Sequence, residues 1–276
     1  MTVTITGATR LYAIIGDPIA QVGSPKAFTE RFAAAGKDAV LVPMHVPADR
    51  FDTVVPGLMG IGNLDGLLVT VPFKPRMVPF ASRLGPAAKC ISAVNALRRE
   101  ADGSWTADMF DGAGFVRAME RKNAVLRKRR VLLFGAGGAG SAIAYELAKA
   151  GVAAIAIADP QAERAGALAK TLRAAVPACD VTTGASASSA VDMIVNASPL
   201  GMRPDDALPG DIGTLRAEML VGDVVVSESP TPLVRHALRH GCMHVTGRDM
   251  LSGQVDAILD FFGSASGTMT SRQRPS

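Results

Sequence analysis

The chain has 276 residues, a length that suits two domains better than one. Hydrophobic residues make up 48% of it and aromatic residues only 5%, so we expect an aliphatic core of the kind found in α/β proteins with parallel strands. The net charge is +4, and the basic run at 127–130 has no interleaved aromatic residues. No apolar run reaches membrane-spanning length, so we predict neither nucleic acid nor a membrane as a partner.

Apolar strand-like segments and helical segments alternate through the first part of the chain. The predicted elements, in order, are a strand at 11–15, a helix at 24–35, a strand at 39–45, a helix at 50–60 and a strand at 66–71. The first helix is expected to take Ser24 as its N-cap and Pro25 as its first residue. Strands that alternate with helices predict a mostly parallel sheet.

The second part of the chain begins again with an apolar strand. Its predicted elements are a strand at 130–134, a helix that ends near 150, a strand at 152–158, a helix at 162–174, strands at 191–196 and 224–227, a helix at 231–241 and a last helix at 251–262. We therefore predict two α/β domains, at 1–114 and at 115–247. The tail at 264–276 is rich in Ser, Gly, Thr and Arg and is expected to be disordered.

A glycine-rich loop lies between the strand at 130–134 and the helix that follows it. Its G-x-G-x-x-G pattern has the strand before and the helix after that a dinucleotide site requires. The first glycine permits the tight turn, the second lets the backbone approach a pyrophosphate, and the third lets the helix pack on the strand. The loop residues expected to bind the cofactor are Gly135, Ala136, Gly137, Gly138, Ala139 and Gly140.

Asp159 ends the next predicted strand and completes this pattern. Its carboxylate would accept hydrogen bonds from the adenosine ribose hydroxyls and would repel a 2′-phosphate. No basic residue follows at once in Asp159-Pro160-Gln161, and Arg164 on the next helix could either stack on adenine or be exposed. We therefore predict NAD rather than NADP as the cofactor.

Other charged and metal-ligating residues give no further site. The basic run 127–130 is interpreted as a solvated linker rather than an anion-binding patch. The three cysteines and four histidines lack the spacing of a metal or redox site, so we predict no metal and a cytoplasmic location. The protein is expected to be a monomer or a homodimer.

Several motifs, spread over nearly the whole chain, resemble those of the shikimate dehydrogenase family. The matching segments are Gly16–Pro25 for the N-terminal signature, Gly66–Lys74 for the lysine motif, Ala93–Leu97 for the asparagine motif, Asp111–Phe115 for the aspartate motif, Asn196–Met202 for the nicotinamide-side loop and Gln254 for the glutamine of the last helix. The resemblance implies that the α/β domain at 1–114 is the substrate domain and that the domain at 115–247 is a Rossmann dinucleotide-binding domain. It also implies that the last helix, at about 248–263, returns to the first domain.

The resemblance implies hydride transfer between NAD(P) and a ring carbon that bears a hydroxyl, as in shikimate or quinate. It implies Lys74 and Asp111 as the catalytic pair, and the chemistry agrees because alcohol oxidation needs a group that accepts the hydroxyl proton. The implied substrate-binding residues are Ser24, Thr70, Asn95 and Gln254, and the implied residues on the nicotinamide side are Asn196, Ser198, Met202 and Gly247.

The chain departs from the family pattern at several pocket positions. Val22 replaces a serine, Leu68 an asparagine, Met109-Phe110 an Asn-Thr pair, Val226 a tyrosine and Glu228 a proline. Because these changes remove polar groups that would hold a polyol, we expect poor activity on shikimate itself.

The sequence thus predicts an NAD-dependent dehydrogenase for a cyclic hydroxy acid related to shikimate or quinate. One alternative is a genuine shikimate dehydrogenase of aromatic amino-acid biosynthesis. A second alternative is a non-catalytic NAD-binding sensor, which the presence of both Lys74 and Asp111 disfavours.

Overall fold

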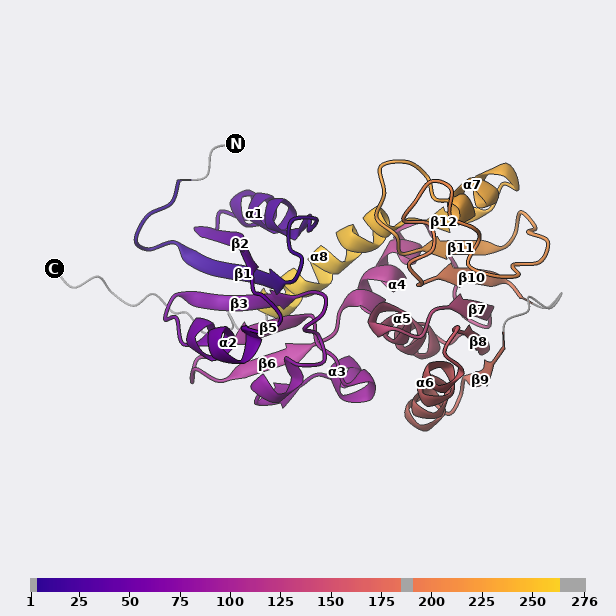
Figure 1. Cartoon of the computed structure of the whole chain (residues 1–276). Coiled ribbons are helices and arrows are strands. Elements are labelled where there is room, and N and C mark those ends of the chain that lie inside the picture. Colours follow the sequence, from indigo (N-terminus) through magenta and orange to yellow (C-terminus); the bar gives the residue numbers. More distant parts are fainter. Residues whose placement is uncertain (1–3, 185–190, 264–276) are drawn as a thin grey trace. The chain divides into compact units, whose positions relative to one another are not determined.

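The computed structural model describes residues 4–184 and 191–263, so the predicted disordered tail at 264–276 lies outside the described residues. Packing divides the chain into two compact units. The first unit contains the chain up to Met109 and again from Val255 onward, and the second contains Phe110–Gln254. Each unit is built around one six-stranded sheet (Figure 1). Among the helices of the described residues, none reaches the length and hydropathy that a membrane-spanning segment needs.

The sheet of the first unit is mixed but mostly parallel. Its strands, in spatial order, are β2 (Ala39–His45), β1 (Arg10–Gly16), β3 (Leu64–Val69), β5 (Ala96–Arg99), β6 (Trp105–Asp108) and β4 (Arg83–Leu84). Only β5 runs antiparallel to its neighbours. The helices of this unit are α1 (Ser24–Ala34), α2 (Phe51–Met59), the short 3₁₀ helix η1 (Val78–Phe80) and α3 (Pro86–Ile91).

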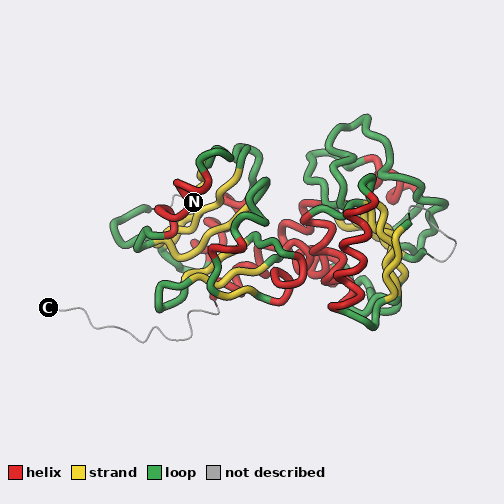
Figure 2. Tube along the Cα trace, turned by 60° about the horizontal axis from the view of Figure 1, so that its bottom comes forward, coloured by secondary structure: helices red, strands yellow, loops and turns green. Residues whose placement is uncertain are grey.

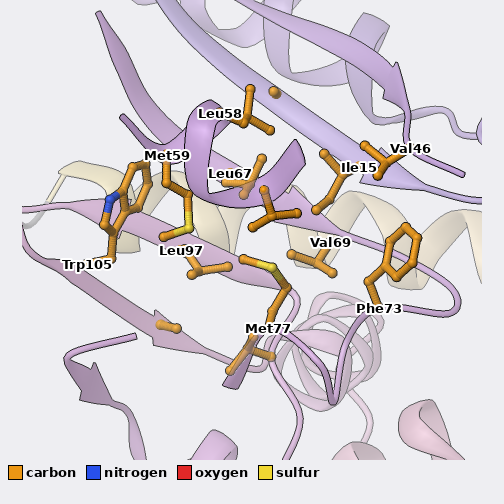
Figure 3. Packing of buried hydrophobic residues seen from close by; sticks show 14 of the residues in the cluster. Ile15, Val46, Leu58, Met59, Leu67, Val69, Phe73, Met77, Leu97 and Trp105 are labelled. Carbon is orange, nitrogen blue, oxygen red and sulfur yellow. The ribbon is translucent and has the colours of Figure 1, made fainter. Parts of the chain in front are cut away.

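Both faces of this first sheet are covered. Alternate residues of β1 point to opposite sides, so that Ala13 and Ile15 join a core with α2, while Tyr12 faces the other way. Figure 3 shows the first of these cores, with Ile15 among its labelled residues. On the opposite face the Tyr12 ring packs on Phe32 of α1 and Phe262 of the last helix, at ring-centroid distances of 4.6 and 4.9 Å.

The sheet of the second unit is entirely parallel. Its strands, in spatial order, are β12 (Met243–Val245), β11 (Leu220–Asp223), β10 (Met193–Asn196), β7 (Arg130–Phe134), β8 (Ala154–Ala158) and β9 (Asp180–Thr183). The accompanying helices are α4 (Asp111–Arg121), α5 (Gly138–Lys149), α6 (Ala162–Ala175) and α7 (Pro232–Arg239), whereas α8 (Gly247–Gly263) begins in the second unit and ends in the first. Figure 2 shows the strands in yellow and the helices in red. The strand order is that of a doubly wound dinucleotide-binding fold, whose ligand lies beyond the carboxyl ends of the strands where the order reverses, here at β7 and β10. The predicted fold class is confirmed.

One predicted strand was misplaced. The strand expected at 224–227 is β11, at Leu220–Asp223. Gly222 and Asp223 have the composition of a turn, yet both are buried within the strand. A Cβ at Gly222 would lie 2.4 Å from the ring of Phe115, so a glycine is needed there for α4 to pack on the sheet.

The start of α1 also differs from the expectation. Ser24 is the first helical residue, Gly23 precedes the helix, and no side chain caps it. The Ala27 N–H donates to the Gly23 carbonyl over 3.3 Å, so the first helical hydrogen bond begins one residue earlier than predicted.

Candidate active site

The first unit gathers predicted substrate residues where β1 and β3 end. Thr70 directly follows β3, and its N–H donates to the Ile15 carbonyl of β1 over 3.0 Å. A Cβ at Gly16 would lie 2.4 Å from Cγ2 of Thr70, so the glycine that ends β1 gives Thr70 its place. Ser24 lies in the first turn of α1 and is 9% exposed.

Lys74 and Asn95 also lie near the end of β3. The Val94 N–H donates to the Lys74 carbonyl over 3.1 Å, which fixes the backbone of the lysine next to that of Asn95. The Asn95 carbonyl accepts the N–H of Val69, the last residue of β3, over 2.9 Å, and the Asn95 side chain is buried. The backbone therefore brings Thr70, Lys74 and Asn95 together within the first unit.

The second unit joins Asp111 to Gln254. Asp111 is the first residue of α4 and is 3% exposed, and its Oδ1 accepts a hydrogen bond from Nε2 of Gln254 over 2.6 Å. Two glycines allow this contact between α4 and α8. A Cβ at Gly114 would lie 2.7 Å from the Gln254 backbone nitrogen, and a Cβ at Gly253 would lie 2.3 Å from the Gly114 carbonyl oxygen. Lys74 belongs to the first unit and Asp111 to the second, so their pairing stays a prediction.

The glycine-rich loop has the geometry that a dinucleotide site needs. Gly135 turns out of β7 with a φ of +97°, and its N–H donates to the Ala158 carbonyl over 2.8 Å. A Cβ at Gly140 would lie 2.0 Å from the Gly135 carbonyl oxygen, so α5 can return close to the strand only with a glycine there. A Cβ at Gly137 would meet no atom within 4 Å. This open side of the loop lies at the N-terminus of α5, where backbone N–H groups favour an anion.

Asp159 is held by the same loop. Its Oδ2 accepts the Ala136 N–H over 2.7 Å, and its Oδ1 accepts the Gln161 N–H over 2.8 Å. The carboxylate therefore stays fixed at the end of β8, with further lone pairs to accept hydrogen bonds from a ligand. Arg164 is exposed on α6.

The predicted nicotinamide-side loop is fixed by a buried polar network. Asn196 is fully buried at the end of β10 and uses Oδ1 to accept the Ser198 hydroxyl over 2.6 Å. Its Nδ2 donates to the Leu200 carbonyl over 2.8 Å and to Oδ1 of Asp223 over 3.1 Å. The other predicted residue of this loop, Met202, is exposed.

The sequence analysis missed Asp223 and Thr231. Asp223 is 1% exposed, and its Oδ2 accepts the Thr231 hydroxyl over 2.6 Å. Burial raises the pKa of Asp223, against the opposite effect of its hydrogen bonds from Thr231, Val225 and Asn196. The sequence did carry a signal at Thr231, because Thr-Pro before an amphipathic segment is an N-cap pattern, and Thr231 caps α7.

The remaining positions divide between core and surface. Leu68 is 3% exposed within β3, whereas Val226 is 60% exposed after β11. Glu228 lines a pocket of about 210 Å³ between the segment after β11, α7 and the start of α8. In the part of the chain that the structure describes, no three His, Cys, Asp or Glu side chains gather as a metal site would require.

Two family models match the chain. The shikimate dehydrogenase substrate binding domain matches residues 14–97, which include Lys74 and Asn95. The ThiF family matches residues 113–162, which include the glycine-rich loop and Asp159.

Similar proteins extend the match over the whole chain. The shikimate dehydrogenase (NADP(+)) of Rubrobacter xylanophilus is 37% identical over 251 residues, which are 90% of this chain and 88% of that protein. Among solved structures, the 5-ketofructose reductase of Gluconobacter sp. strain CHM43 has a TM-score of 0.84 at 26% identity, over 93% of this chain and 94% of that one. The quinate dehydrogenase from Corynebacterium glutamicum, in complex with NAD, has a TM-score of 0.82 at 28% identity, over 94% of each chain. The chain belongs to the shikimate dehydrogenase family.

Proposed function

We propose that the protein is an NAD-dependent dehydrogenase that acts on a cyclic hydroxy acid related to shikimate or quinate and has poor activity on shikimate itself. Family membership supplies the coarser part, a nicotinamide-dependent oxidoreductase that acts on a CH–OH group. The finer part consists of the cofactor choice and the substrate, and each rests on residues of this chain.

Asp159 is the observation that carries the cofactor choice. Its carboxylate is held between the Ala136 and Gln161 N–H groups at the end of β8, where a dinucleotide fold places the adenosine ribose. A fixed negative charge there accepts the ribose hydroxyls of NAD and repels the 2′-phosphate of NADP. The Rubrobacter relative is named for NADP(+) and the Corynebacterium structure holds NAD, so this local charge decides the preference in our proposal.

The cofactor-binding residues in the second unit fit a dinucleotide. The open side of the loop at Gly137 leaves room for a pyrophosphate beside the N-terminus of α5. A dinucleotide held by these residues would supply the acceptor for the hydride that leaves the substrate carbon. In the proposed reaction Lys74 accepts the hydroxyl proton, and Asp111 orients the reacting hydroxyl while Gln254 holds its carboxylate in place.

The altered pocket residues carry the substrate proposal. Leu68 is a buried aliphatic side chain where the family pattern has an asparagine, and Val22 has no hydroxyl with which to bind a carboxylate or ring hydroxyl. Each lost hydrogen bond costs about 0.5–1.5 kcal/mol, so the loss of several removes orders of magnitude from kcat/KM for shikimate. The likeness to a 5-ketofructose reductase supports the view that this fold accommodates substrates other than shikimate.

Shikimate dehydrogenase activity itself is the second candidate, favoured by the name of the Rubrobacter relative. Steady-state kinetics with NAD and NADP on shikimate, quinate and cyclic hydroxy acids with fewer hydroxyls separates the two. We expect a higher kcat/KM with NAD and a better substrate than shikimate in this panel. A preference for NADP, or shikimate as the best substrate, would contradict the corresponding part of the proposal.

A further inference from the structure

Asp223 is a buried carboxylate that the proposed reaction does not use. It ends β11 beside Asn196 of β10, is 1% exposed and accepts three hydrogen bonds. Oδ1 accepts Asn196 Nδ2 over 3.1 Å and the Val225 N–H over 3.0 Å, and Oδ2 accepts the Thr231 hydroxyl over 2.6 Å. All three partners donate, so both oxygens of Asp223 serve as acceptors in the network.

The three donors belong to two different segments at the carboxyl ends of the central strands. Asn196 carries the loop that follows β10, because its amide also binds Ser198 and the Leu200 carbonyl. Val225 begins the segment that follows β11. Thr231 ends that segment, and its hydroxyl accepts the Val234 N–H over 3.2 Å as the cap of α7. One carboxylate therefore fixes both segments.

The start of α8 packs against the segment after β11 that Asp223 holds. A Cβ at Gly247, the first residue of α8, would lie 2.5 Å from the carbonyl oxygens of Val224 and Val225. The start of α8 is capped by two reciprocal hydrogen bonds. Asp249 Oδ2 accepts the Thr246 N–H over 2.8 Å, and Thr246 Oγ1 accepts the Asp249 N–H over 3.3 Å. Displacement of Val225 would thus be transmitted to Gly247.

We infer that Asp223 is the positioning residue of the nicotinamide end of the cofactor site, acting through Asn196 and Val225. The inference rests on the proposed function. The adenosine end is assigned to other elements, since the glycine-rich loop follows β7 and Asp159 ends β8. Loss of the Asp223 network should therefore impair the nicotinamide end of the bound cofactor and leave the adenosine end intact.

The test compares a ligand that has the nicotinamide ring with one that lacks it. The full-length chain is titrated with NADH and with ADP-ribose, and kcat is measured with NAD and an accepted hydroxy acid. Asp223→Asn keeps the shape but replaces one acceptor oxygen with an amide N–H2 group, which cannot accept the Thr231 hydroxyl proton. Thr231→Val removes that hydroxyl, whereas Thr231→Ser keeps it.

We expect Asp223→Asn and Thr231→Val to lower kcat by about tenfold or more and to reduce the fluorescence enhancement of bound NADH, with the affinity for ADP-ribose within about twofold of wild type. Thr231→Ser should behave as wild type. Asp192→Asn is the matched control. Asp192 directly precedes the start of β10, at the end of the strand opposite to Asn196, and its Oδ2 accepts the Arg130 N–H over 3.0 Å.

Two outcomes overturn the inference in distinguishable ways. If the wild-type chain binds neither NADH nor ADP-ribose, the proposed function fails and the inference fails with it. If the wild type binds both, but Asp223→Asn and Thr231→Val keep normal turnover or weaken ADP-ribose as much as NADH, the inference alone fails, because the network then has only a general structural role.

Discussion

Lys74 is the side chain whose replacement should separate chemistry from cofactor binding. Lys74→Met keeps most of the apolar stem and removes the proton acceptor, so kcat should fall by about 10²–10⁴-fold. NADH affinity, followed by fluorescence titration, should stay the same because the proposed cofactor contacts are made by residues of the second unit. Lys89→Met, which changes an exposed lysine of α3, is the control. Near-normal turnover of Lys74→Met would remove the catalytic assignment.

Asp159 should determine the choice between NAD and NADP. Asp159→Ala removes the charge and the acceptor of the Ala136 N–H, so NAD should bind more weakly and the penalty on a 2′-phosphate should disappear. We expect the ratio of kcat/KM for NAD over NADP to fall by about tenfold or more, as for the loss of a charged hydrogen-bonding group. The control is Asp180→Ala, which changes an exposed carboxylate at the start of the neighbouring strand β9, at the opposite end of the β8–β9 pair from Asp159. An unchanged ratio in Asp159→Ala would refute the role of this residue.

At the scale of elements, the crossing of α4 and α8 depends on small residues. Gly114→Ala would place a Cβ 2.7 Å from the Gln254 backbone, so the helices must separate and Gln254 must move from Asp111. We expect a loss of about 1–3 kcal/mol in the free energy of unfolding, measured in urea, together with a lower kcat/KM.

The control for this crossing is Gly166→Ala in α6, where a Cβ would meet no atom within 4 Å. In an open helix interior this change should stabilise the protein by about 0.5–1 kcal/mol. Equal effects of the two alanine substitutions would show that helix propensity, and not the α4–α8 contact, determines the result at Gly114.

Tyr12, in the aromatic stack on β1, should make the free energy of unfolding depend on pH. Burial, with the Asp65 carboxylate as a further cause, raises the pKa of Tyr12 from its usual 10.0 to about 12. As the pH rises, the Tyr12 hydroxyl loses its proton at a lower pH in the unfolded chain than in the folded one. The contribution of Tyr12 to the free energy of unfolding is therefore fully present below about pH 10 and is lost as the pH rises towards about 12.

Tyr12→Phe should remove this dependence. The difference in the free energy of unfolding between wild type and Tyr12→Phe should change by about 2–3 kcal/mol across this interval, measured by urea unfolding at several pH values. A constant difference would show that Tyr12 does not titrate differently in the folded and unfolded chains.

The elements that could be predicted from the sequence are those whose own residues indicate a strand or a helix without reference to a neighbouring segment. The apolar segment before the glycine-rich loop needed no partner to be recognised as β7. By contrast, β5 reads Ala-Leu-Arg-Arg and becomes a strand only through pairing with β3 and β6. Asp223 was likewise hidden, because nothing local distinguishes a buried acceptor from a turn aspartate until Asn196 and Thr231 are brought to it.

The same limit applies to the candidate site. The motifs of the glycine-rich loop and of Asp159 are local, and the structure shows them in hydrogen-bonded contact. The contact of Gln254 with Asp111 joins residues far apart along the chain and depends on Gly114 and Gly253, which carry no functional group of their own. Sequence patterns named the polar partners but not the glycines that let them meet.

At the scale of the whole molecule, the departures from the family pattern are distributed over both units. Val22 and Leu68 belong to the first unit and Val226 to the second. Combining Val22→Ser with Leu68→Asn should raise kcat/KM for shikimate by about tenfold or more, since two hydrogen-bonding groups return. Val22→Ser alone is the companion variant, because an asparagine at the buried Leu68 position also costs stability. No gain in either variant would place the altered specificity elsewhere.

The division of the first unit between the two ends of the chain sets the order in which the protein can be completed during synthesis. Residues up to Met109 leave the ribosome first, yet the Phe262 ring that packs on Tyr12 is made only after the whole of Phe110–Gln254. At about 5–20 residues per second this delay is roughly 8–30 s, during which one face of the β1–β3 sheet lacks its last helix. The second unit, which is continuous in sequence, is therefore expected to fold first, and a nascent chain stalled before Phe262 should expose apolar surface to chaperones.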